Sequence, residues 1–176
     1  MLDNLDEMEI QQHFSLKKLN TFGIEAFASQ LVVVKNEDEL RVACRLSAQP
    51  KRVLGGGSNI LLPGDLPGLT LKNEIGGIRI VEETDGAAVV EVGGGVVWHD
   101  LVLWAIGQGL GGLENLSLIP GTVGAAPIQN IGAYGWVCWW MFSSASQRWT
   151  WPRATPKFFI LPIVNLGTGT AFSKGN

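Results

Sequence analysis

The sequence has few cysteines, few histidines and no long apolar run, and each shortage excludes a class of protein. Cys44 and Cys138 are too few for a disulfide framework and lack the spacing of a metal site. We expect Cys44 to be a buried helical thiol without a reactive role. No apolar stretch is long enough to span a membrane, and residues 1–12 are too acidic for a secretory signal. We therefore expect a cytoplasmic protein with no metal and no membrane partner.

Positive charge is also scarce, with 13 basic residues against 16 acidic ones and a net charge of −3. No basic stripe could follow a phosphate backbone, so we expect no nucleic-acid partner, and the sequence predicts no protein partner. Apolar residues make up 46% of the chain, which excludes disorder. The 23 glycines indicate a turn-rich fold with close backbone approaches, and 176 residues suffice for one domain or two small ones.

Composition changes abruptly after residue 135. Residues 136–176 contain no acidic residue, and five of the seven tryptophans lie between Trp136 and Trp151. Neither helical nor strand periodicity organises this tail, and three prolines interrupt it. Two explanations stay open at this point: a domain boundary or a disrupted reading frame.

Before residue 136, short apolar runs alternate with helical patterns. Asn36 is a plausible N-cap for a helix that continues through Leu46-Ser47, and a second helix is expected from Trp98 to Gly107. The pattern predicts an α+β architecture with parallel pairing across the first helix. The expected strands are Leu31–Val34, Arg52–Leu54, Ile60–Leu62, Leu69–Leu71, Ile78–Glu82 and Ala87–Val92.

Two glycine runs follow expected strands. In Gly55-Gly56-Gly57-Ser58-Asn59 the backbone amides could converge on an anion, with Ser58 and Asn59 adding side-chain donors. The run lacks the spacing of the Rossmann fingerprint and the acidic residue that accompanies it. A tight turn and a phosphate cradle both remain open. Gly93-Gly94-Gly95 has no following hydroxyl and is expected to be a strand-to-helix connection.

The stretch from Leu113 to Gly135 is rich in small residues, so a large planar ligand could lie directly against its backbone. Its few polar groups could orient such a ligand, because a long irregular stretch inside a compact domain usually serves one. The alternative is an irregular packed loop. His99 lies at a helix start and is expected to be solvent-facing or capping rather than a general base. His13 and the acidic residues 3–9 are expected to belong to a solvated leader that spans residues 1–19.

Three motifs resemble those of the bacterial UDP-N-acetylenolpyruvylglucosamine reductases: Asn20-Thr21-Phe22-Gly23, the run Gly55–Asn59, and the stretch from Gly112 to Gly135. The resemblance covers about residues 13–135, under half of a complete family member. It implies an FAD-binding fold of the vanillyl-alcohol oxidase type, with two α+β subdomains, about 20–72 and 73–135, that clasp the cofactor.

The resemblance also implies the chemistry: NADPH reduces the flavin, which reduces the enolpyruvyl group of a nucleotide-sugar substrate for peptidoglycan synthesis, and so serves the cell wall, cell shape and division. FAD would perform the redox step while the protein orients it. Gly55, Gly56, Gly57, Ser58 and Asn59 would hold the pyrophosphate. The residues implied around the flavin and its ribityl chain are Ser117, Pro120, Gly121, Thr122, Gly124, Asn130, Ile131, Gly132 and Tyr134.

The sequence departs from the family after residue 135. The Tyr-Arg-Asp-Ser motif and the later domain with its proton-donating serine are absent, so no catalytic residue is assigned. A non-catalytic flavin-binding fragment is therefore the alternative to an active reductase. Another FAD oxidase of the same fold is less favoured, because no histidine or cysteine lies in the motifs to link the flavin covalently.

The genetic code offers an explanation for the tail. Residues 166–175 can be encoded as CTG GGT ACC GGG ACA GCG TTT TCA AAG GGA. Starting from the third base, the same nucleotides encode Gly-Tyr-Arg-Asp-Ser-Val-Phe-Lys-Gly, which contains the missing motif. We interpret residues 136–176 as translated out of frame and expect them to pack poorly, with exposed tryptophans.

Overall fold

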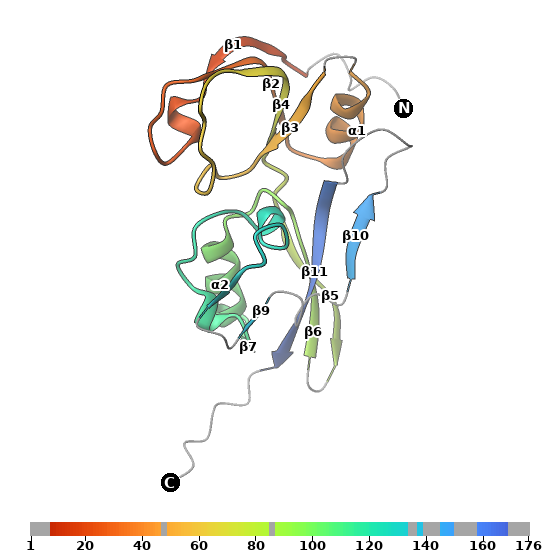
Figure 1. The fold of residues 1–176 in the computed structure, drawn as a ribbon. Coiled ribbons are helices and arrows are strands. Elements are labelled where there is room, and N and C mark those ends of the chain that lie inside the picture. The colour runs from red at the N-terminus through yellow and green to blue at the C-terminus, as the bar shows by residue number, and fades with distance from the viewer. Residues whose placement is uncertain are drawn as a thin grey trace. The chain divides into compact units, whose positions relative to one another are not determined.

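The computed structural model describes residues 8–46, 49–84, 87–133, 137–138, 145–149 and 158–168. They belong to two compact units, residues 1–76 and residues 77–176, coloured from red to yellow and from green to blue (Figure 1). Each unit combines a sheet with one α-helix, which is the α+β architecture that the sequence predicts. None of the described helices is long and apolar enough to cross a membrane.

The first unit is a four-stranded sheet with the order β1-β2-β4-β3. β1 runs antiparallel to β2, whereas β2 and β3 both run parallel to β4. The strands flanking the helix are therefore parallel as expected, but β4 lies between them. The bounds are β1 Gln11–Ser15, β2 Phe27–Val34, β3 Lys51–Leu54 and β4 Leu66–Asn73, with a 3-10 turn η1 over Lys17–Leu19.

Helix α1, Glu37–Arg45, connects β2 to β3 and packs against β2. Its N-cap is Asn36, as predicted: Oδ1 accepts a hydrogen bond from the Glu39 amide at 2.9 Å. The Glu39 carboxylate in turn accepts from the Asn36 side chain and the Lys35 amide, at 2.7 Å each. Cys44 faces the core and is buried, which confirms the expected structural thiol. Burial raises the pKa of the Cys44 thiol to about 11, against a smaller opposing effect of the Lys51 charge.

Two expectations about the first unit are wrong. The leader expected over residues 1–19 ends earlier, because Gln11–Ser15 forms β1 and Leu16 is fully buried. This edge strand is polar in sequence, so its composition conceals it. The strand expected at Ile60–Leu62 does not form. Leu62 is buried there while Leu61 is 70% exposed, in a loop that contains Pro63 and Gly64 and runs up to β4.

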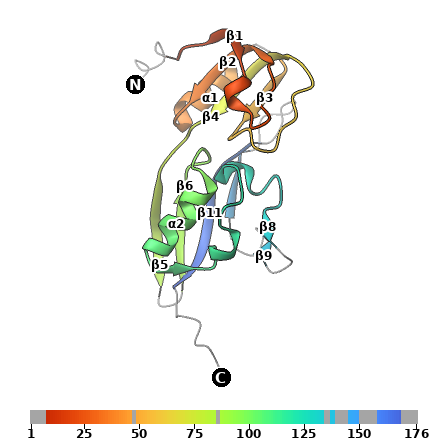
Figure 2. The same ribbon diagram turned by 90° about the vertical axis from the view of Figure 1, so that its left-hand side faces the viewer.

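The second unit contains an antiparallel sheet with the order β10-β11-β6-β5, and β7 also pairs with β11. Helix α2, Trp98–Gly107, packs Trp98 and Leu101 against Val90 of β6 in one core (Figure 2). The strand bounds are β5 Ile78–Thr84, β6 Ala87–Val92, β7 Leu110–Gly111, β10 Ala145–Trp149 and β11 Phe158–Thr168, with a short pair of β8 Gly132–Ala133 and β9 Val137–Cys138. Two 3-10 turns, η2 Glu114–Leu116 and η3 Val123–Ala125, follow α2.

The tail contains strand structure that its periodicity does not predict. β11 pairs antiparallel with β6 from Ile163 opposite Glu91 to Gly167 opposite Ala87, so its backbone belongs to the sheet. Backbone pairing requires no alternation of side chains, and a segment rich in aromatic and β-branched residues favours an extended chain. The side-chain packing of the tail lies outside what the structure describes, so the expected poor packing and the shifted frame both stay predictions.

Candidate functional site

The run Gly55–Asn59 forms a loop directly after β3, and its shape depends on Gly57. Gly57 has a φ of +68°, and a Cβ built there would lie 1.9 Å from the Leu19 carbonyl oxygen. The Thr21 amide donates to the Gly57 carbonyl at 3.1 Å, which joins the loop to the turn before β2. Only glycine satisfies both the left-handed backbone and this close approach.

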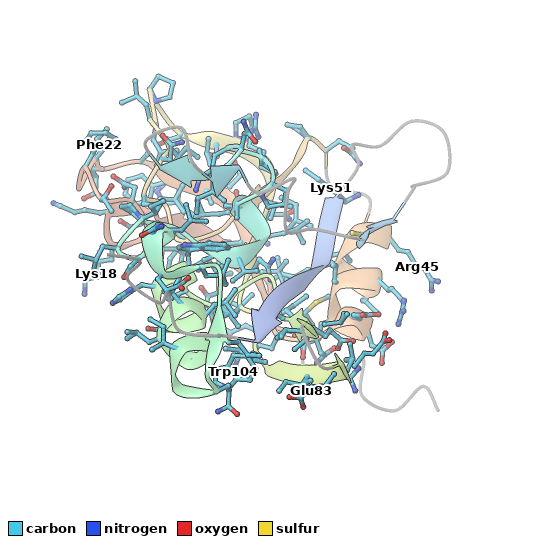
Figure 3. The ribbon with its side chains drawn as sticks, turned by 90° about the horizontal axis from the view of Figure 1, so that it is seen from below. Lys18, Phe22, Arg45, Lys51, Glu83 and Trp104 are labelled. Atoms are coloured by element: carbon cyan, nitrogen blue, oxygen red, sulfur yellow. The ribbon has the colours of Figure 1, made fainter. Side chains whose placement is uncertain are left out.

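Asn20 organises that turn from inside. The side chain is 7% exposed, and its Nδ2 donates to the carbonyls of Leu16 at 2.8 Å and of Ile24 at 3.0 Å. Its Oδ1 accepts from the Ile24 amide at 3.0 Å. Phe22, two residues later, projects from the turn into solvent (Figure 3). The motif Asn20–Gly23 thus braces the glycine loop, a role that spacing along the chain could not reveal.

In the second unit, the stretch after α2 is fixed by the glycine connection before α2. The Val123 amide donates to Val96 O and the Gly124 amide to Gly94 O, at 2.9 Å each. A Cβ on Gly124 would lie 2.8 Å from Gly94 O, so the two segments are in direct backbone contact. Gly93–Gly95 is the expected strand-to-helix connection, and it also supports this stretch.

The first turn of α2 holds the same stretch with two adjacent side chains. Trp98 is fully buried, and its Nε1 donates to Leu116 O at 2.8 Å. His99 Nδ1 lies 3.2 Å from Ser117 Oγ and 3.4 Å from the Leu118 amide nitrogen. His99 is thus neither simply solvent-facing nor a cap of its own helix. Its partners are 18 and 19 residues away, too far for sequence reasoning to connect them.

This stretch exposes two large apolar side chains beside the polar side chains of Glu114, Asn115 and Asn130. Leu118, with a φ of +63°, is 76% exposed, and Ile128 is 75% exposed. The amides from Ala125 to Ile131 are largely consumed by internal turns, for example Ile131 N to Ala126 O at 3.0 Å. A ligand therefore finds apolar side chains here rather than free backbone donors.

The family model described as FAD binding domain matches residues 28–143. The chain belongs to the FAD-binding domain family. The FAD-binding domain contains both glycine runs and the stretch after α2.

The curated relatives carry one name, UDP-N-acetylenolpyruvoylglucosamine reductase. The Azoarcus sp. (strain BH72) protein is 56% identical over 127 residues, which are 68% of this chain and 37% of that protein. The Flavobacterium johnsoniae protein is 50% identical over 129 residues, 73% of this chain and 38% of that one. The chain therefore spans less than two fifths of the length of these relatives.

A solved structure, the UDP-N-acetylenolpyruvylglucosamine reductase from Thermus caldophilus, shares the fold. It aligns with a TM-score of 0.62 at 24% identity and covers 90% of this chain and 61% of its own. The expected α+β FAD-binding fold is thereby confirmed.

The loop at Gly55–Asn59 fits the anionic part of FAD. Among the described residues, none accepts a hydrogen bond from the amides of Gly56, Gly57, Ser58 or Asn59. Gly56 and Asn59 are exposed, and Gly57 holds the left-handed conformation that lets successive amides point to one side. Of the two interpretations, the structure favours a loop that presents donors over a turn that consumes them.

The predicted flavin-lining residues differ in exposure. Pro120, Asn130 and Gly132 are exposed, and Ser117 and Gly121 are half-buried. The residues buried within the second unit are Thr122, Gly124 and Ile131, and Tyr134 lies outside the described residues. Asn130 has a φ of +47°, a conformation that asparagine tolerates better than most residues. Contact of each with flavin stays a prediction. In the described part of the chain, no group of three His, Cys, Asp or Glu side chains could hold a metal.

Proposed function

We propose that this chain provides the FAD-binding part of a reductase that converts UDP-N-acetylenolpyruvoylglucosamine to UDP-N-acetylmuramate with NADPH. The name shared by the relatives supports this substrate, and the identity of 50–56% over the FAD-binding part supports the same cofactor. A cytoplasmic location and a role in cell-wall formation, cell shape and division follow from that reaction.

The chain's own residues would bind and orient the cofactor. The amides of Gly55–Asn59 and the Ser58 hydroxyl would neutralise the pyrophosphate. The exposed apolar side chains of Leu118 and Ile128 would exclude water from the ring, while Ser117 and Asn130 offer hydrogen bonds. The predicted contacts of Pro120, Gly121, Thr122, Gly124, Ile131, Gly132 and Tyr134 belong to the same proposal. When bound, FAD supplies hydride-transfer chemistry that side chains lack.

The observation that carries the proposal is the glycine loop: the amides of Gly56–Asn59 find no acceptor among the residues that the structure describes, and Gly57 fixes the shape of the loop. It is tested by titrating the purified full chain with FAD and following flavin fluorescence. We expect saturable binding by the parent chain and by Gly64→Ala, because a Cβ at Gly64 meets nothing within 4 Å. Gly57→Ala should weaken binding strongly, since its Cβ collides with the Leu19 carbonyl. Equal affinity of both variants would contradict the assignment.

A second candidate is a chain that binds flavin without turnover. The absence of the Tyr-Arg-Asp-Ser motif from residues 1–176 favours it. NADPH oxidation that depends on the enolpyruvyl substrate distinguishes the two candidates.

The domain division is part of the proposal: an FAD-binding domain over residues 20–135 and a tail from 136 translated out of frame. The composition of the tail supports the shifted frame, since it has no acidic residue. Sequencing the gene around codons 130–140 tests it. A shift there is expected, and an unbroken frame that encodes residues 136–176 would refute it.

A further inference from the structure

The left-handed backbone at Leu118 marks the place where the stretch after α2 departs most from ordinary geometry. A φ of +63° is uncommon for a residue with a branched side chain and persists only when neighbouring groups fix it. Its amide donates a hydrogen bond to His99 Nδ1 at 3.4 Å. The same nitrogen lies 3.2 Å from the hydroxyl of Ser117.

The chemistry of these contacts determines the role of His99 Nδ1. A backbone amide can only donate, so His99 Nδ1 accepts from the Leu118 amide. The Ser117 hydroxyl can also donate, and at 3.2 Å it shares the single lone pair of Nδ1 with that amide. One acceptor atom thus holds two successive residues of the stretch.

The hydrogen bonds of the neighbouring Trp98 show which part of the stretch depends on His99. Trp98 fastens Leu116 through Nε1 at 2.8 Å, and its own amide donates to Gly121 O at 3.0 Å. These bonds fix the two sides of the segment from Ser117 to Pro120. Between them, among the described residues, the amide of Leu118 is held by His99 alone.

We propose that His99 is a positioning residue for the cofactor: its unprotonated Nδ1 holds Ser117 and Leu118 in the conformation that binds the flavin part of FAD. The inference rests on the proposed function. It assigns no proton transfer to His99. It requires that residue 99 place a hydrogen-bond acceptor where Nδ1 of His99 lies.

The requirement is tested by three substitutions that differ in where an acceptor lies. Asparagine places its Oδ1 close to the position of Nδ1, glutamine carries its oxygen one atom further out, and leucine has no acceptor. Loss of one such hydrogen bond should weaken FAD binding by about tenfold in His99→Leu. We expect His99→Asn to restore most of the affinity and His99→Gln to resemble His99→Leu, as measured by flavin fluorescence on the full chain.

Hydrogen exchange of the Leu118 amide in the ligand-free chain provides a readout independent of FAD. Its protection should fall in His99→Leu and His99→Gln and be retained in His99→Asn. Equal FAD affinity in all four chains would overturn the inference, and so would a loss that follows only the midpoint of urea unfolding. Failure of the parent chain to bind FAD would overturn the proposed function, and the inference with it.

Discussion

Replacing Asn20 by alanine should destabilise the first unit by about 3 kcal/mol, because three hydrogen bonds end on this one side chain. They are the donations to Leu16 O and Ile24 O and the acceptance from Ile24 N, at 2.8–3.0 Å. Each contributes about 1 kcal/mol net, and more where the backbone partner is left buried without a replacement. The 7% exposure of Asn20 leaves little room for water to substitute.

The measurement must report on the first unit, and tryptophan fluorescence does not, because no tryptophan precedes Trp98. Amide hydrogen exchange of β2 and β4 follows the opening of that unit directly. A loss of about 3 kcal/mol corresponds to a fall in protection of about a hundredfold, at 1.4 kcal/mol for each factor of ten. Asn20→Asp keeps an acceptor for Ile24 N, but it places a buried carboxylate oxygen against the carbonyl oxygens of Leu16 and Ile24, so its loss should be at least as large as that of Asn20→Ala. A fall of less than fivefold in Asn20→Ala would refute the reasoning.

Three further predictions concern single buried atoms. Gly124→Ala should lower the urea midpoint of the second unit, since its Cβ would lie 2.8 Å from Gly94 O. The control is Gly107→Ala in the last turn of α2, which should keep or raise the midpoint because nothing lies within 4 Å of its Cβ. Thr70→Val should stabilise the first unit by about 1 kcal/mol in the same exchange assay, because the fully buried Thr70 hydroxyl has no partner among the described residues, and an unchanged protection would count against this. In a Cys138→Ser background, Cys44 should react with a thiol reagent at pH 8 only after denaturant is added, since burial raises its pKa to about 11 and keeps the thiol protonated; fast labelling of the native chain would contradict it.

Local signals in the sequence predict the helices and most strands. Asn36 and the acidic residues after it mark the start of α1, and the apolar spacing of Trp98–Gly107 matches α2 in both bounds. Gln11–Ser15 escapes prediction because an edge strand needs only one neighbour and can be polar. Ile60–Leu62 is predicted wrongly as a strand because all three residues are apolar. In the structure they lie in a loop, where Leu62 is buried and Leu61 faces solvent.

For the candidate site, the sequence predicts the segments but not their hydrogen bonds. Composition identifies Gly55–Asn59 and the stretch from Leu113 to Gly135 as segments that can meet a ligand. It cannot show which amides are free, since that depends on partners far along the chain. Nor can it separate a residue that contacts a ligand from one that shapes the contact, as the burial of Gly124 illustrates.

The two units fix their proposed cofactor-binding loops in the same way. In each, hydrogen bonds from a second segment fix a loop that we propose binds the cofactor, and the residues of that second segment need not contact FAD themselves. Asn20 and Thr21 hold the turn against Gly57, and Trp98 and His99 hold Leu116 and Leu118. A loop with unused amides or exposed apolar side chains is unstable alone, because its own contacts do not offset the conformational entropy that is lost when the loop is ordered. Selection for the cofactor should therefore act on these holding residues as strongly as on the glycines, and substitutions there should weaken FAD binding while the binding residues themselves stay unchanged.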